Sequence, residues 1–283
     1  MKLLKKLACA TAVAMSMGAA QAAPVLNNWV FNPNGGGFAD GQTINEYLDV
    51  NGNSFIQITP GSGSSFTFRE HAVFNIDQAD SNGQDFDDNY AGGNISATFE
   101  ATGTGNFGGA FTFTGGTIRM YQNETNQYSS TAGIYGANLG NEIAVFTVMA
   151  GGGGLVDASG SPTNNGQITV FARAAAGALD EGYFFRENGD DLSMESIMAF
   201  AFTNANTIGS PTQTLVSEVA CEYAGFTGNG CNGQAYANTP TYFFVSNNGQ
   251  FKLSEVPEPG SLALFGIAIL GAGVVARRRT AKV

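Results

Sequence analysis

Short runs in which apolar and polar residues alternate dominate the middle of the chain. The clearest run is 94–102, where Ile95, Ala97, Phe99 and Ala101 share one face and polar residues share the other. Similar runs, rich in Phe, Val, Ile and Thr and bounded by Gly, Asn or Pro, cover 54–59, 65–74, 111–113, 118–120, 142–149 and 167–172. A period of two is typical of strands with one buried face. We therefore predict an all-β chain.

Glycine and asparagine mark the predicted connections between these strands. Residues 115–116, both glycine, fit a two-residue hairpin turn. The glycine run 151–154 and the segment 161–166 have the composition of loops. A last hairpin is expected to pair 242–245 with 250–253 across an Asn-Asn-Gly connection.

One segment has the signals of a helix. Asp191 can cap a helix in which Glu195 lies in the first turn and Ile197 and Phe200 fall near helical spacing. A short helical turn is also expected within 38–49. No repeat of 20–50 residues is present, which argues against propellers and solenoids. About ten strands with one short helix predict an antiparallel β-sandwich or jelly-roll-like domain.

The N-terminus has the three parts of a secretory signal peptide. Lysines within the first six residues precede an apolar run over 7–17, and Ala20 and Ala22 form an A-x-A cleavage site. We expect cleavage after Ala22, so that 1–22 is removed and 23–254 folds as a β-rich extracellular domain. A short buried helix is the alternative interpretation of this segment.

The C-terminal segment 255–283 predicts a transmembrane helix. The stretch 261–276 is uncharged, and as a helix it would be about 24 Å long at ~1.5 Å per residue. Arginines that extend to the interface can make up the difference from a ~30 Å hydrocarbon core. The positive-inside rule then places the arginines in the cytoplasm and the β-rich domain outside. An apolar helix packed on the domain is the alternative.

This tail resembles the PEP-CTERM sorting signal of Gram-negative bacteria, which has a Pro-Glu-Pro triplet, an apolar helix and an arginine cluster in that order. The matching residues are Pro257, Glu258 and Pro259, then Arg277, Arg278 and Arg279. The resemblance implies export, tethering in the inner membrane, recognition by an exosortase-type membrane protease, and transfer to the cell surface or release. It also implies an association with exopolysaccharide and with biofilm or floc material.

The domain between the two ends is strongly acidic. Residues 23–256 contain five basic and 22 acidic residues, so their net charge is −17, compared with −11 for the whole chain. Such a charge repels nucleic acid and anionic lipid, and we expect neither as a partner of this domain. It attracts divalent cations, although it can also serve only to keep an exported protein in solution.

Two cysteines, Cys221 and Cys231, remain once the signal peptide is removed. Thiols oxidise outside the inner membrane, so an even pair there predicts a disulfide. A redox or metal-binding pair is the alternative, but the spacing is not C-x-x-C and no histidine lies nearby in the sequence.

A cluster of acidic and amide residues within 77–89 suggests a calcium site. The candidate ligands are Asp77, Asp80, Asn82, Asp85, Asp87 and Asp88. Oxygen ligands at this density can hold Ca²⁺, although their order departs from the EF-hand loop. A solvated acidic loop is the alternative, and Ca²⁺ is the one cofactor that the sequence suggests.

Signals of catalysis are weak. His71 is the only histidine of the chain, so a Ser-His-Asp site would need it. Neither a G-x-S-x-G elbow nor a phosphate-binding loop with lysine is present. A glycosidase needs only two carboxylates, so a polysaccharide-processing enzyme is kept as a less favoured alternative. We expect no enzymatic activity.

Four segments outside the tail are similar to the flocculation-associated PEP-CTERM proteins, namely 29–35, 107–111, 184–189 and 242–251. This resemblance implies a non-enzymatic surface or matrix protein that holds cells and secreted polysaccharide together. A carbohydrate-binding module that uses exposed Tyr, Phe or Trp29 as sugar platforms is the alternative.

Overall fold

The computed structural model describes residues 25–79, 84–85, 94–163 and 166–256. Within these ranges, Val25–Ser254 forms one compact unit. The all-β prediction is confirmed, because nearly every long element is an antiparallel strand. Across the described ranges we find no helix that combines the length and the apolar character needed to span a bilayer.

The long strands form one antiparallel sheet that closes on itself. They are β3 (Leu48–Pro60), β4 (Ser65–Ala79), β6 (Asn94–Asn106), β7 (Ala110–Asn123), β8 (Asn141–Val148), β9 (Gly151–Leu155), β10 (Gln167–Ala174), β12 (Ile197–Thr207) and β13 (Tyr242–Glu255). A two-residue strand, β5 (Gln84–Asp85), pairs with β4. The strand order is β12-β13-β3-β4-β6-β7-β8-β10, and pairing of β10 with β12 closes the sheet. In this order β13 pairs with both β3 and β12. Within the described residues, such closure pairs the long strands on both sides and so protects their edges from other chains.

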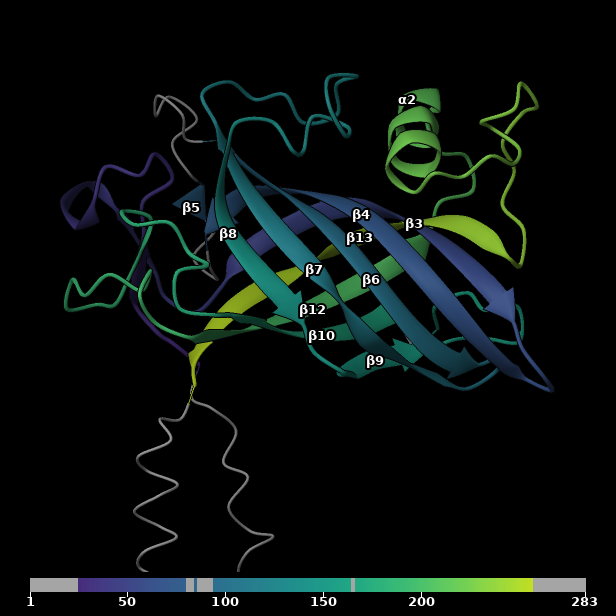
Figure 1. Ribbon diagram of the computed structural model, residues 1–283, viewed down its shortest axis with the longest axis horizontal. Helices are drawn as coiled ribbons and strands as arrows, with labels where there is room; N and C mark the ends of the chain where they lie inside the picture. Colours follow the sequence, from purple (N-terminus) through teal and green to yellow (C-terminus); the bar gives the residue numbers. More distant parts are fainter. Residues whose placement is uncertain (1–24, 80–83, 86–93, 164–165, 257–283) are drawn as a thin grey trace, which may run out of the picture. The chain divides into compact units, whose positions relative to one another are not determined.

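The closed sheet has two facing halves. In Figure 1, β4, β6, β7 and β8 run across the front, and β10, β12 and β13 cross behind them. The inward side chains of both halves form one large apolar core, which includes Phe68, Phe99, Phe113 and Ile168. Facing halves with a shared core correspond to the layers of the predicted sandwich.

The glycine run 151–154, which we expected to be a loop, is a strand. Here β9 continues the line of β8, and both pair with β7 and β10. A Cβ atom on Gly153, whose φ is +105°, would lie 1.9 Å from the backbone oxygen of Phe111. The absence of side chains therefore lets three backbones pair closely at this point.

Two predicted hairpin turns are also wrong. Residues 115–116 lie inside the continuous strand β7, where a Cβ on Gly116 would be 2.1 Å from the carbonyl oxygen of Glu100 on β6. Residues 242–253 form the single strand β13, in which Asn248 pairs in register with Asn51 of β3. In both places the glycine that resembles a turn residue lies inside a strand, where the lack of a side chain allows a neighbouring strand to approach closely.

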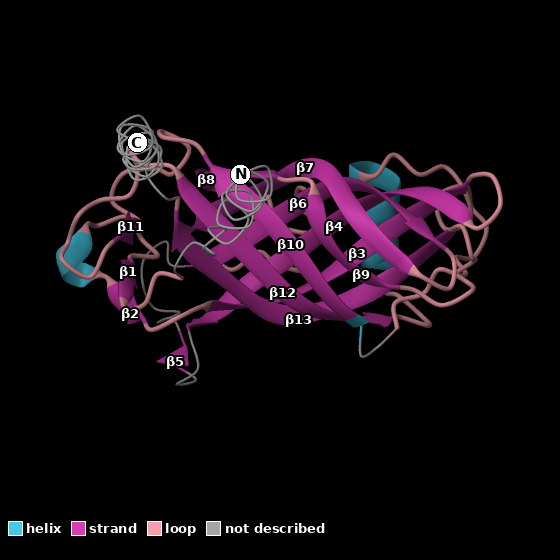
Figure 2. Ribbon diagram, turned by 90° about the horizontal axis from the view of Figure 1, so that it is seen from below, coloured by secondary structure: helices cyan, strands magenta, loops and turns pink. Residues whose placement is uncertain are grey.

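A small sheet packs at one end of the closed sheet. It has the order β11 (Phe184–Phe185), β1 (Trp29–Phe31) and β2 (Gln42–Ile44), seen at the left of Figure 2. The short helical turn expected within 38–49 is η1 (Phe38–Asp40). Trp29 is fully buried and stacks on Phe184 at 6.3 Å between ring centroids. The segments 29–35 and 184–189 therefore lie together.

The one short helix lies elsewhere than predicted. The α-helical turn α2 (Gln213–Leu215) continues into the π-helical turns of η3 (Val216–Tyr223). Thr212 caps it by accepting a hydrogen bond from the Leu215 backbone N–H at 3.2 Å. This helix lies against the outer face of the sheet near β3, as Figure 1 shows, and forms a second apolar core there. The core contains Phe55, Val73, Tyr135, Ala137, Leu215, Val216, Val219, Ala220 and Phe244.

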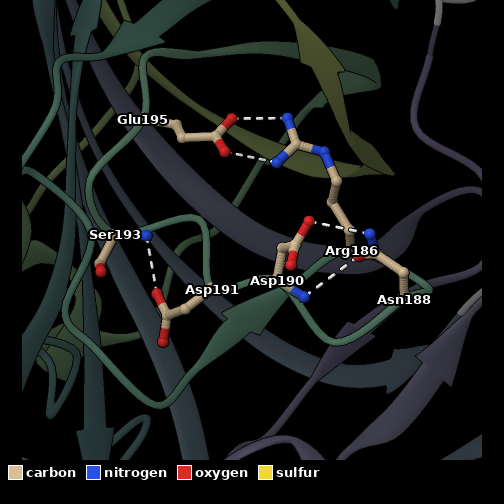
Figure 3. Close-up of polar contacts among 6 residues, drawn as sticks. All are labelled: Arg186, Asn188, Asp190, Asp191, Ser193 and Glu195. Atoms are coloured by element: carbon tan, nitrogen blue, oxygen red, sulfur yellow. Dashed lines mark hydrogen bonds and ion pairs between the residues drawn. The ribbon is translucent and has the colours of Figure 1, made fainter.

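The helix predicted from Asp191 to Phe200 is wrong. Ile197 begins strand β12, and a loop precedes it. Asp191 caps a turn by accepting from the Ser193 backbone N–H at 2.8 Å. Figure 3 shows this contact beside the ion pair of Arg186 with Glu195, in which two N–O distances are 2.5 Å. Asp191 and Glu195, which resemble the first residues of a helix, stabilise the loop by these contacts.

Candidate functional site

The predicted disulfide is present in the structure. Cys221, near the end of η3, is bonded to Cys231, and their Cα atoms are 5.4 Å apart. The enclosed loop brings Phe226 against Phe55 of β3, with ring centroids 5.1 Å apart. The bond therefore secures the loop that packs over the second core.

Replacing both cysteines by serine is expected to lower the free energy of unfolding by about 2.5–3 kcal/mol, because the unfolded chain regains the freedom of a loop of about ten residues. Urea unfolding of the variant and of the wild type would measure the difference. Reduced wild-type protein is the control and should lose a similar amount. A loss below about 0.5 kcal/mol would contradict a stabilising role.

An outward polar surface spans three strands that are neighbours in the sheet. We call it the amide shelf, and its residues are Asn51 and Asn53 of β3, Asn204 and Asn206 of β12, Ser246 and Asn248 of β13, and Tyr128. They surround a surface hollow of about 280 Å³. The period-two pattern explains the arrangement, since the residues between these positions point inward and are buried.

Hydrogen bonds order part of this surface. The Asn248 side-chain amide donates to Oδ1 of Asn51 at 2.5 Å, and the Ser246 hydroxyl donates to the Asn206 carbonyl at 3.4 Å. Each asparagine amide offers both donors and an acceptor without carrying charge. A surface of this kind can hydrogen-bond to a hydroxyl-rich chain that lies across it.

A carboxyl group that the sequence analysis did not single out lies in the interior of the closed sheet. Glu70 of β4 borders two cavities of about 60 and 30 Å³, whose linings are otherwise uncharged. Burial raises its pKa to about 7, although a side-chain hydrogen bond with Ser54 opposes the rise. Asn247 donates to the Ser54 hydroxyl at 2.5 Å. These three residues form a polar group inside an apolar core.

The signal for Glu70 was present in the alternation of its strand. Phe66 and Phe68 precede it at intervals of two, and both are buried in the interior. Their parity assigns Glu70 to the same inward face. Arg69 and His71, on either side, have the opposite parity.

Trp29 and His71, two residues with a possible functional role, are both buried in the structure. Trp29 was considered as a sugar platform, but its side chain is fully buried, so that assignment is wrong. His71 is also buried, with its ring 5.0 Å from that of Tyr223 in an edge-to-face contact. Burial lowers the pKa of His71, which favours the neutral imidazole.

The predicted calcium ligands lie mostly beyond what the structure describes. Asp77 lies in β4 and Asp85 in β5, which pairs with β4 next to it. The side chains of both, and all of Asp80, Asn82, Asp87 and Asp88, fall outside the described residues. Among the residues that are described, no three His, Cys, Asp or Glu side chains gather in a metal-binding group. The calcium site stays a prediction.

The processing signals also fall outside the described residues. These are Ala20 and Ala22, then Pro257, Glu258 and Pro259, the predicted transmembrane helix, and Arg277, Arg278 and Arg279. Comparison with known proteins does test the C-terminal signal. Residues 255–279 match the family described as the PEP-CTERM protein-sorting motif. The chain matches no curated protein and no solved structure.

The match indicates how the protein is exported and sorted. A PEP-CTERM motif indicates an exported, extracellular protein that is sorted to the cell surface through exosortase, a membrane protease. The matched segment covers the Pro-Glu-Pro triplet, the apolar stretch and the arginine cluster.

Proposed function

We propose that this exosortase-sorted protein is a non-enzymatic component of the extracellular matrix, which holds secreted exopolysaccharide and promotes floc or biofilm formation. The amide shelf is the observation that carries this proposal. It presents exposed Asn204, Asn206 and Asn248 side by side on neighbouring strands. A rigid row of neutral donors and acceptors suits a repeating hydroxyl-rich polymer, since its groups are positioned before binding.

A carbohydrate-binding module that does not promote aggregation is the second candidate, and the same shelf favours it. The two functions differ in their effect on cells. A matrix protein is needed for flocs to hold together, whereas a module that only binds polymer leaves settling unchanged when it is removed. A deletion strain assayed for settling, with the secreted polymer quantified, separates them.

The double substitution Asn204→Ala and Asn206→Ala is expected to weaken binding to purified exopolysaccharide at least tenfold. It removes two side chains from the shelf at exposed positions of β12, and tenfold is about 1.4 kcal/mol, within the range of a few lost hydrogen bonds. Co-sedimentation of the mature protein with the polymer measures the change. Asn106→Ala, at an exposed position outside the shelf, is the matched control. Equal binding by all three proteins would refute the shelf as the contact surface.

A further inference from the structure

A second polar hollow lies on the outer face of β6 and β7, apart from the amide shelf. Thr98 and Glu100 of β6 face it together with Arg119 and Tyr121 of β7, and Tyr223 at the end of η3 forms another wall. The hollow measures about 240 Å³. We call it the tyrosine cleft. The register pairs Thr98 with Arg119, so these groups sit on adjacent strands of the rigid sheet.

The groups of the cleft lie on elements that are fixed in place. Thr98 and Glu100 line it from β6 and Tyr121 lines it from β7, while Tyr223 lies at the end of η3 with its ring 5.0 Å from that of His71 in an edge-to-face contact. The helix that carries Tyr223 is fixed in turn by the second core and by the disulfide. Two phenol rings, a carboxylate and a hydroxyl group therefore have set positions before any ligand arrives, which lowers the entropy lost on binding.

Among the described residues that line the cleft, Arg119 is the one cation, and it is paired with a carboxylate. Nη1 of Arg119 lies 2.7 Å from Oε2 of Glu142, and these side chains are 46% and 39% exposed. An ion pair this exposed contributes little to folding stability. It does offset the charge of Arg119, so Glu100 is the unbalanced charge among the described residues that line the cleft. Uronic acids, sulfates and phosphates would meet repulsion there, within a domain that is itself strongly acidic.

We propose that the tyrosine cleft binds an uncharged sugar unit. The hydroxyls of such a unit can donate to Glu100 and accept from Arg119, while the tyrosine rings contact its apolar C–H faces. This inference rests on the proposed function, because it names the class of saccharide that the protein recognises. It assigns the selection of neutral sugars to a site distinct from the amide shelf.

Oligosaccharides released by partial acid hydrolysis of the cells' own exopolysaccharide would test the proposal. They are separated into neutral and acidic fractions by anion exchange, and each is titrated into the mature protein by calorimetry. We expect the neutral fraction to bind and the acidic fraction to show at least tenfold weaker affinity. Binding of neither fraction, or preferential binding of the acidic fraction, would overturn the proposal.

Two variants locate the site. Glu100→Gln and Tyr121→Ala should each weaken binding of the neutral fraction at least tenfold, with circular dichroism confirming that both fold. Glu124→Gln removes the same charge at an exposed position outside the cleft lining and should bind as the wild type does. Unchanged binding by both folded cleft variants would refute the site. A deletion strain that still settles normally would refute the matrix function alone, since binding of neutral sugar at the cleft could persist.

Discussion

The free energy of unfolding of the wild-type protein should fall by about 3 kcal/mol between pH 4 and pH 8 because of Glu70. Replacing Glu70 by glutamine should abolish this fall. The carboxyl lies inside the closed sheet, where burial raises its pKa from 4.5 to about 7. Glutamine has nearly the shape of the protonated acid but cannot ionise. The variant should therefore match the wild type at low pH and exceed its stability at high pH.

The sign follows from proton binding. Between about pH 4.5 and pH 7 the folded protein keeps the Glu70 proton while the unfolded chain has lost it. The folded state binds more protons in this window, so its stability falls as the pH rises. Above about pH 7 both states are ionised, and the difference between wild type and variant becomes constant.

Urea unfolding of both proteins at a series of pH values measures this effect. The informative quantity is the difference between the two unfolding free energies, because groups that titrate in both proteins cancel. Glu124→Gln, which removes an exposed carboxylate, should show a difference that is nearly independent of pH. A constant difference for Glu70→Gln across the same range would mean that Glu70 ionises freely inside the sheet.

Much of the fold follows from the local alternation of apolar and polar residues. The wrongly predicted turns and loop within strands share one cause. The runs that begin near Ser54, Ser65 and Asn94 are strands in the structure, because one side of each is buried by its own parity. Glycine misled the prediction at Gly116 and Gly153, where it allows close strand contact and does not end a strand. Composition does not distinguish these two uses of glycine, since the difference depends on which strand lies opposite.

The helix was misplaced for a related reason. The Asp191 segment has the capping residues of a helix, but pairing of Ile197–Thr207 with β10 and β13 determines its structure. The true helix did carry a local signal. Thr212 is a suitable cap, and Val216, Val219 and Ala220 follow at helical spacing and are buried. A search for this pattern would have found it.

The two candidate binding surfaces differ in how far sequence could predict them. The alternation in 94–102 predicts that Thr98 and Glu100 lie on the same polar face of one strand. The sequence therefore predicts the part of the tyrosine cleft that β6 contributes. The amide shelf joins Asn51 to Asn204 and Asn248, which are far apart in sequence. They meet only because β13 lies between β3 and β12 and pairs with both, and no local pattern specifies that pairing.

Replacing Phe55 by alanine should lower the free energy of unfolding by about 3–5 kcal/mol, the usual range for a buried aromatic residue. Phe55 points outward from β3 yet is fully buried beneath the helix and the disulfide loop. Its ring centroid lies 5.0 Å from that of Phe244 and 5.1 Å from that of Phe226. Alanine would leave a cavity between the sheet and this cover, since the rings on either side are held by separate elements.

Urea unfolding at a fixed pH measures this loss, and two further variants determine its origin. Phe55→Leu should cost less than Phe55→Ala, because it keeps part of the buried volume. Phe202→Ala removes the same ring from an outward position of β12 that is 44% exposed, and it should cost far less. If Phe55→Ala and Phe202→Ala lost the same stability, the second core would not hold the helix on the sheet. Tyr223 would then lack the fixed position that the tyrosine cleft requires, so this stability measurement also tests the structural premise of the proposed sugar site.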